Sequence, residues 1–308
     1  MGVVYPFYRT MHEKYGFDVA VANVKELAWI TKSKKKSDKI DSLKLARLHM
    51  VGMLPESHLL TREEQLARDL LIQRVKLGED IRKVKLRALS YLKREGVNEN
   101  LPKMSDNFSS TRRHLMRSLS FGDERDLIMK TMLDRLEFLE EQCVPFEAAI
   151  KVRAKLSDDV KILMSVKGID FYLASLLSSY IGDVNRFPSD NQLASAFGIV
   201  PVERQSSSVK KIGRMSREGP GVARWALSVA ADCVRQQNEQ IRAYYEVAKK
   251  RTGRSKKARI VTMRKLLRML YFMLKTRQNW KWENPESTRE KISRLDSNAR
   301  RWIPSSGQ

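Results

Sequence analysis

The sequence predicts a mainly α-helical protein with a partial α/β unit at its N-terminus. Apolar residues recur at spacings of three and four over residues 61–160, which is the period of packed helices. Residues 160–280 continue with helical stretches that turn residues separate. Only residues 17–22 show the alternation of a strand. The chain has 308 residues, 42% of them hydrophobic, which suggests about two domains with real cores.

The N-terminal elements are predicted from short local patterns. Pro6 suits the first turn of a helix, and Gly16 and Gly52 suit helix ends. The expected order is a helix at 6–15, a strand at 17–22, a helix at 24–30, a basic stretch at 32–36 and a helix at 37–51. A single strand cannot form a stable sheet. We therefore expect either that a partner supplies strands or that the N-terminal part of a larger domain is absent.

Two long helices are predicted over residues 61–160, each with a coiled-coil seam. The seams are Ala67, Leu70, Arg74, Leu77, Ile81, Val84, Ala88 and Tyr91, and then Met129, Met132, Leu136, Leu139, Cys143, Phe146 and Ile150. Residues 96–122 are rich in Ser, Asn and Pro and are expected to be a connection. Pro145 is expected to kink or break the second helix. Cys143 is expected to serve packing, because it lies on the seam.

Residues 160–280 are predicted to be helical with more frequent turns. Residues 167–170 separate two helical stretches, and residues 188–190 begin another. Three further helices are expected at 222–236, about 239–251 and 257–280. Residues 199–220 are Ser-rich, basic and Gly-containing, and are expected to be irregular. The polar residues from Glu283 onward are expected to form a loose tail.

The charge of the chain is strongly positive and unevenly distributed. Lys and Arg total 59 against 36 Asp and Glu, a net charge of +23, and the pI is about 10.1. Such a chain usually binds a polyanion, with nucleic acid the first candidate and an anionic membrane surface the second. Residues 201–280 hold 20 Lys/Arg and 5 Asp/Glu. This clustering favours a phosphate-binding surface over a merely solvated basic face.

Several other classes are excluded. The sequence contains no run of about 18 apolar residues and no signal-peptide pattern, so membrane residence is not expected. Cys143 and Cys233 form no CxxC pair, which excludes a disulfide scaffold and a zinc finger. The histidines show no metal-ligand spacing, and neither a Walker A loop nor a GxSxG elbow is present. The expected compartment is the reducing cytoplasm.

Asp38 and Asp41 are the first candidate site. They are three residues apart at a helix start, so their carboxylates share a face. A bound Mg²⁺ would explain two like charges held together. The alternative is that they are first-turn acids favoured by the helix dipole. Two carboxylates are fewer than two-metal phosphoryl chemistry usually recruits.

Ser206, Ser207 and Ser208 are the second candidate site. Four cations follow them, Lys210, Lys211, Arg214 and Arg217. Cations beside a serine suit attack on a phosphodiester, because they stabilise the added negative charge. The alternative is a solvated loop that contacts phosphates without chemistry.

Two further segments suit contact with a nucleic-acid backbone. Lys167 and Gly168 lie in a turn between helices, where backbone N–H groups can meet a phosphate as in helix-hairpin-helix modules. Asp170 stands where a second glycine would strengthen that pattern. A basic connection between two later helices suits phosphate contact rather than base reading. It contains Lys249, Lys250, Arg251, Arg254, Lys256 and Lys257.

On these residues the chain resembles the insertion-sequence transposases that pair a RuvC-like DEDD domain with a serine-bearing C-terminal domain (the IS-one-ten group, including Piv-type invertases). The C-terminal motifs occur in the family's order: residues 163–168, residues 181–183 with 186–187, "LASAFGIVP" at 193–201, "GRMSREG" at 213–219 with Arg224, and the closing helix at 257–280. At the N-terminus, "KKSDKIDSLKLARL" resembles the segment that bears the last two acids of the DEDD set. The family's first Asp and its Glu would precede Met1.

The resemblance implies a DNA recombinase that cuts and rejoins strands with Mg²⁺ (or Mn²⁺) and a serine. Asp38 and Asp41 match metal-binding acids, and Ser206 matches the nucleophile, five residues after Pro201. It further implies that Lys210, Lys211, Arg214 and Arg224 hold the scissile phosphate or its neighbours. Expected partners are DNA, a structured guide RNA from the same element and further copies of the chain, as a dimer or tetramer at the nucleoid. Ser207, Asp170 and Pro220 depart from the family pattern, which has Gly, Gly and Asn there.

The expected organisation has four parts. These are a partial RuvC-like domain lacking its first strands (1–60), a helical coiled-coil region (61–160), a helical serine-bearing transposase domain with a helix-hairpin-helix-like turn (161–282) and a polar tail (283–308). The alternative function is a truncated, inactive relic that binds nucleic acid and associates without catalysis. A helical scaffold with no recombination ancestry would explain the charge but not the ordered motifs.

Overall fold

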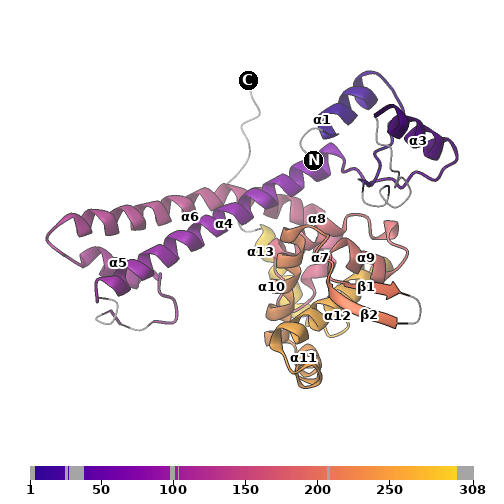
Figure 1. Cartoon of the computed structure of the whole chain (residues 1–308). Coiled ribbons are helices and arrows are strands. Elements are labelled where there is room, and N and C mark those ends of the chain that lie inside the picture. The colour runs from indigo at the N-terminus through magenta and orange to yellow at the C-terminus, as the bar shows by residue number, and fades with distance from the viewer. Residues whose placement is uncertain are drawn as a thin grey trace. The chain divides into compact units, whose positions relative to one another are not determined.

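The computed structural model describes residues 4–24, 27, 38–97, 101–102, 104–206 and 209–296. The chain divides into two compact units, Met1–Glu63 and Glu64–Gln308. The described residues are mainly helical, as predicted (Figure 1). None of the helices in this part of the chain is long and apolar enough to span a membrane.

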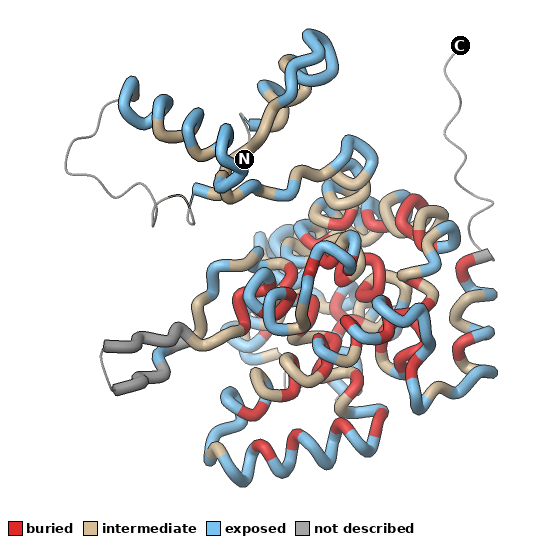
Figure 2. Tube along the Cα trace, turned by 90° about the vertical axis from the view of Figure 1, so that its right-hand side faces the viewer, coloured by how far each residue is buried: buried red, intermediate tan, exposed pale blue. Residues whose placement is uncertain are grey.

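The first unit contains α1 (Val4–Arg9), the π-helix η1 (Thr10–Lys14) and α3 (Asp38–Met50). Gly16 and Gly52 follow these helices with φ of +70° and +66°, which confirms the predicted helix ends. Every described residue of the unit is exposed or half-buried, as the pale blue and tan tube in Figure 2 shows. The burial that a domain core requires is therefore found in the second unit.

The predicted strand at residues 17–22 is wrong. Its backbone forms one isolated antiparallel bridge, between Ala22 and Glu56. Alternating side chains suit a strand, but without a neighbouring strand the ladder cannot extend. The predicted RNase H-like remnant is therefore not visible as a sheet in the described residues. Most of the predicted helix at 24–30 and the basic stretch at 32–36 lie outside them.

The second unit begins with a helical arm. It consists of α4 (Arg62–Arg94), α5 (Ser110–Ser118) and α6 (Glu124–Leu156). The C-terminal half of α4, α5 and the N-terminal half of α6 share a buried cluster that includes Val84, Met116 and Leu133. In the N-terminal half of α4, Leu71 and Val75 are buried instead of the predicted Leu70 and Arg74. These two residues join the core of the C-terminal helices, so this half does not follow a coiled-coil seam.

Two expectations about the arm need correction. Residues 96–122 are not only a connection, because they contain α5, which Ser109 caps by accepting from the Arg112 N–H. This nine-residue helix has only two apolar residues, Leu115 and Met116, so composition does not reveal it. In addition, α6 runs unbroken through Pro145. Pro145 is exposed, while Cys143 and Ala149 are buried and hold the helix on both sides of it.

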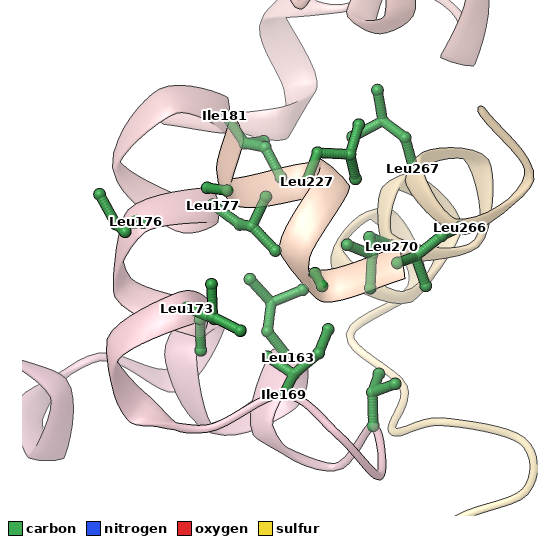
Figure 3. Packing of buried hydrophobic residues seen from close by; sticks show 14 of the residues in the cluster. Leu163, Ile169, Leu173, Leu176, Leu177, Ile181, Leu227, Leu266, Leu267 and Leu270 are labelled. Atoms are coloured by element: carbon green, nitrogen blue, oxygen red, sulfur yellow. The ribbon is translucent and has the colours of Figure 1, made fainter. Parts of the chain in front are cut away.

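The remaining helices enclose the main core. They are α7 (Asp158–Met164), α8 (Phe171–Ile181), the 3₁₀ turn η2 (Val184–Arg186), α9 (Asp190–Ala196), α10 (Gly221–Gln237), α11 (Glu239–Thr252), α12 (Ser255–Thr276) and α13 (Pro285–Asp296). Leu177 of α8, Leu227 of α10 and Leu270 of α12 belong to one buried cluster, and Figure 3 shows the Leu227 helix lying between the other two. Burying one such leucine stabilises a fold by about 2 kcal/mol.

Two segments of this region differ from expectation. Residues 199–220 are not irregular, because they form the antiparallel hairpin β1 (Pro201–Ser206) and β2 (Val209–Met215). The expected loose tail contains α13, whose Leu295 is 1% exposed. The hairpin depends on strand pairing, and α13 depends on burial against helices distant in the sequence. Local composition indicates neither.

Candidate nucleic-acid interface

A close crossing of two backbone segments anchors the hairpin. Gly198 follows α9 with φ of +65°, and a Cβ there would lie 2.6 Å from the amide nitrogen of Gly219. A Cβ at Gly219 would in turn lie 2.8 Å from the nitrogen of Gly198. Side chains are excluded at both positions, so two glycines let the segments touch. The Ser216 N–H donates to the Val200 carbonyl at 2.9 Å beside this crossing.

The hairpin carries the predicted serine and several predicted cations. Its paired residues are Pro201 with Met215, Glu203 with Ile212, Arg204 with Lys211, Gln205 with Lys210, and Ser206 with Val209, with an irregularity between Pro201 and Glu203. Ser206 is therefore the last residue of β1, directly before Ser207 and Ser208, which lie outside the described residues. Lys210, Lys211 and Arg214 belong to β2. Strand pairing thus brings the serine and three cations into one hairpin.

Two predicted arginines lie at the base of the hairpin, in different environments. Arg217 is exposed and has φ of +52°, a left-handed conformation that costs an arginine about 1 kcal/mol. Arg224 is half-buried in the first turn of α10, and its Nη1 donates to the Gly219 carbonyl. Arg217 is available to a ligand, whereas Arg224 braces the glycine crossing.

The turn between α7 and α8 is packed against α10. Gly168 has φ of +100°, and a Cβ there would lie 2.9 Å from the backbone of Cys233 and Val234. The Asp170 carboxylate accepts from the Leu173 N–H at 2.9 Å and so caps α8. This helix cap gives a structural reason for aspartate at the position where the helix-hairpin-helix pattern has its second glycine. Lys167 is exposed at the same turn.

A lysine that sequence reasoning missed holds this turn from the other side. Lys291 of α13 donates from Nζ to the carbonyls of Met164, Val166 and Ile169, at 2.8, 2.9 and 3.1 Å. Burial lowers the pKa of Lys291. No sequence pattern links residues more than 120 positions apart, so only the fold reveals this contact.

The corner between α11 and α12 presents the predicted basic connection to solvent. Gly253 has φ of +64° and ends α11. The six predicted cations are exposed, and none forms an ion pair within the described part of the chain. They are Lys249, Lys250, Arg251, Arg254, Lys256 and Lys257. Unpaired exposed cations are the groups that release counterions on binding a phosphate backbone.

The corner continues into a basic stripe along α12 that was also missed. Lys257, Arg264, Arg268 and Lys275 are separated by seven, four and seven residues, which places them on one face of the helix. Arg264 donates to Asn191 Oδ1 at 2.6 Å, and Arg268 lies 3.6 Å from Asp190, so α9 orients both. Their helical spacing was present in the sequence and could have identified the stripe.

The predicted metal acids lie in the first unit, on α3. Asp41 is exposed and forms an ion pair with Lys44 at 3.7 Å. Asp38 is the first residue of α3, and its side chain lies outside the described residues. No group of three or more His, Cys, Asp or Glu side chains suited to a metal occurs among the described residues. The acids and the serine thus belong to different units of the chain.

The two thiols are not candidates for catalysis. Burial raises the pKa of Cys143 and of Cys233 above the ordinary value. A raised pKa disfavours the thiolate, which is the reactive form. Cys143 is buried among the arm residues, as the packing role predicted.

Comparison with known proteins shows similarity to transposases. Residues 160–246 match the model of the "Transposase IS116/IS110/IS902 family". The chain is 25% identical over 107 residues to a Pseudomonas aeruginosa protein named "Probable family 20 transposase", covering 35% of this chain and 32% of that protein. It is 26% identical over 179 residues to "Putative transposase y4qE" of Sinorhizobium fredii, covering 58% of this chain and 43% of that protein.

Over these residues the chain is similar to insertion-sequence transposases. Its domain over residues 160–246 belongs to the IS116/IS110/IS902 family, which confirms the resemblance inferred from the motifs. The matched segment runs from α7 to α11 and includes the hairpin, the glycine crossing and the α7–α8 turn. The chain spans about a third to two fifths of the length of these two relatives.

Proposed function

We propose that the chain acts on DNA as the recombinase of an insertion sequence and cuts and rejoins strands with a serine. The observation that carries this proposal is the hairpin. It lies inside the segment that matches the transposase family, with Ser206 as the last residue of β1 and Lys210, Lys211 and Arg214 in the paired strand β2. The glycine crossing fixes its base to α9 and α10.

The chemistry would be transfer of a phosphoryl group to the serine. The hydroxyl of Ser206 loses its proton to solvent, and its oxygen forms a bond to phosphorus. The bond from phosphorus to one sugar oxygen breaks, and that oxygen leaves as a hydroxyl after taking up a proton. Lys210, Lys211 and Arg214 would neutralise the charge that develops on the phosphate. Arg217 and Lys167 would contact neighbouring phosphates.

The first unit would contribute the metal-binding acids. Carboxylate oxygens are the ligands Mg²⁺ prefers, and Asp41 is exposed, so the donor chemistry fits Mg²⁺ or Mn²⁺. Asp38 would supply the second carboxylate from the same helix. A bound metal ion would supply positive charge for phosphoryl-transfer chemistry. The ion pair between Lys44 and Asp41 would open when the carboxylate binds the metal.

The α11–α12 corner would bind a nucleic-acid backbone beyond the reacting phosphate. Its exposed cations suit DNA and a structured guide RNA equally, because both present the same phosphates. The chain would work as a dimer or tetramer at the nucleoid, where its DNA is. Binding and association without catalysis are the second candidate function, which the corner favours because its cations need neither metal nor serine.

Alanine substitutions in the serine triplet test the proposal. Ser206→Ala should abolish strand transfer and the covalent protein–DNA adduct, while DNA affinity is retained. Ser195→Ala, at an exposed position of α9, is the control and should transfer normally. Loss of transfer in Ser207→Ala or Ser208→Ala alone would move the nucleophile within the triplet. Unchanged transfer in all three variants would leave nucleic-acid binding as the function.

A further inference from the structure

A pocket of about 220 Å³ lies where α13 meets α6, α7 and the start of α8. A cavity of roughly 150 Å³ accepts a benzene ring, whereas drug-sized ligands occupy about 300 Å³ or more. The pocket therefore suits one flat ring system. The pocket lies next to the α7–α8 turn. Asp170 and Phe171, which follow the turn residue Lys167 in the chain, both line it.

The inner wall of the pocket is apolar. Met164 and Leu295 line it and are both 1% exposed. Phe171 is half-buried and adds an aromatic ring, and the Nζ of Lys151 lies 5.3 Å from the centre of that ring. A planar aromatic ligand gains stacking and burial here.

The polar groups of the pocket define what such a ring must carry. Lys291 already donates to three carbonyls and has no donor left for a ligand. Asp170 uses Oδ1 to cap α8, and Oδ2 accepts no hydrogen bond in the described part of the chain. The free acceptor is thus a carboxylate oxygen, which favours a ring with an N–H donor. Lys151 and Arg294 also line the pocket, with Arg294 lying 3.7 Å from the Glu290 carboxylate, and their positive charge favours an anionic attachment.

We propose that this pocket binds one unstacked base of a bound nucleic-acid strand, with the amine-bearing bases cytosine, adenine and guanine favoured over thymine. These three bases carry an exocyclic amine that can donate to Asp170, as acidic side chains accept from cytosine N4, whereas thymine offers only its ring N3–H. Phe171 supplies the aromatic ring for stacking on the base, and Lys151 and Arg294 supply positive charge for the flanking phosphates. The inference rests on the proposed binding of nucleic acid and adds a contact with a base to contacts with the backbone.

The test uses short single DNA strands that carry one base in an otherwise abasic backbone. These strands share the same charge, so their affinities differ only through the base. For the full chain, a strand with one cytosine should bind about 5- to 150-fold more tightly than the fully abasic strand, as measured by fluorescence anisotropy. Phe171→Ala should remove this gain and leave the affinity for the abasic strand unchanged. Phe138→Ala, at an exposed aromatic position of α6, is the control and should keep the gain.

Asp170→Asn provides a second variant that keeps the fold, because asparagine caps a helix as well as aspartate does. It should remove the preference for cytosine over thymine and retain a gain from either base. This variant decides the question if Phe171→Ala does not fold. A gain of equal size in the wild type and in Phe171→Ala overturns the inference alone. Failure of every strand, abasic or not, and of duplex DNA to bind overturns the proposed function as well.

Discussion

The arm and the C-terminal basic region contain equal numbers of cations but use them differently. Residues 62–156 hold 20 Lys/Arg among 16 Asp/Glu, and residues 201–280 hold 20 Lys/Arg among 5 Asp/Glu. In the arm, Arg113, Arg117 and Arg125 each contact carboxylates across helices or turns. At the α11–α12 corner the cations face solvent unpaired within the described residues. An equal count of basic residues thus conceals a larger surplus over acids, and a cluster of exposed cations at one corner, in the C-terminal basic region.

Charge reversal at the α11–α12 corner should give the largest effect and tests whether these cations, rather than net charge, bind DNA. Replacing Lys249, Lys250 and Arg251 with Glu should lower DNA affinity roughly 100-fold at moderate salt and reduce the salt slope by about 3. The matched control reverses three exposed arm cations, Lys76, Arg82 and Arg87, for the same change in net charge. The control should change affinity only a few-fold. Equal losses in both triple variants would show that net charge alone drives binding.

The attachment of the hairpin gives the next largest effect. Gly219→Ala should destabilise the second unit by about 3 kcal/mol, because its Cβ would overlap the backbone of the segment around Gly198. At Gly253 an added Cβ would meet open space, and the only strain would come from the left-handed φ. Gly253→Ala should therefore lower the free energy of unfolding by about 1 kcal/mol. Urea unfolding measures both free energies. Similar values would mean that the crossing is not close.

The paired cations of the arm predict a smaller effect on stability. Arg113 makes two hydrogen bonds with Glu140, at 2.6 and 2.9 Å, and its side chain is only 20% exposed. Arg113→Met should lower the free energy of unfolding by about 1 kcal/mol and leave DNA affinity unchanged. Lys83→Met removes an exposed pair with Asp80 and should leave stability unchanged. A loss of DNA affinity in Arg113→Met would assign a binding role to the arm.

The smallest effect concerns the junction of the arm with the helical core. Burial raises the pKa of Tyr172 to about 12, and Arg74 of the arm lies 5.4 Å from its ring. In the unfolded chain the Tyr172 phenol loses its proton near its ordinary pKa of 10.0, which is a lower pH than in the folded protein. Stability should therefore fall as pH rises from about 10 to 12, and less steeply in Tyr172→Phe. Phenolate absorbance and unfolding at each pH measure this, and identical slopes would contradict it.

The sequence by itself determined the helices, the clustering of charge and the family. Helix period, caps and stops are local, so residues 158–181 and 221–276 form helices close to the predicted bounds. Charge clustering is visible in composition alone. The ordered motifs, including those around Ser206 and Arg224, lie in the segment that matches the transposase family, so the resemblance needs no knowledge of the fold.

The tertiary structure alone decided how these parts contact one another. The hairpin at residues 201–215 depends on strand pairing, and its base depends on two glycines whose contact no local pattern reports. α13 is polar by composition, yet Leu295 is buried and Lys291 binds three carbonyls of a turn over 120 residues away. Arg224, which was expected to hold a phosphate, also donates to the Gly219 carbonyl, a contact that the sequence did not indicate. Local sequence sets backbone preference, but burial and pairing depend on which distant segments meet.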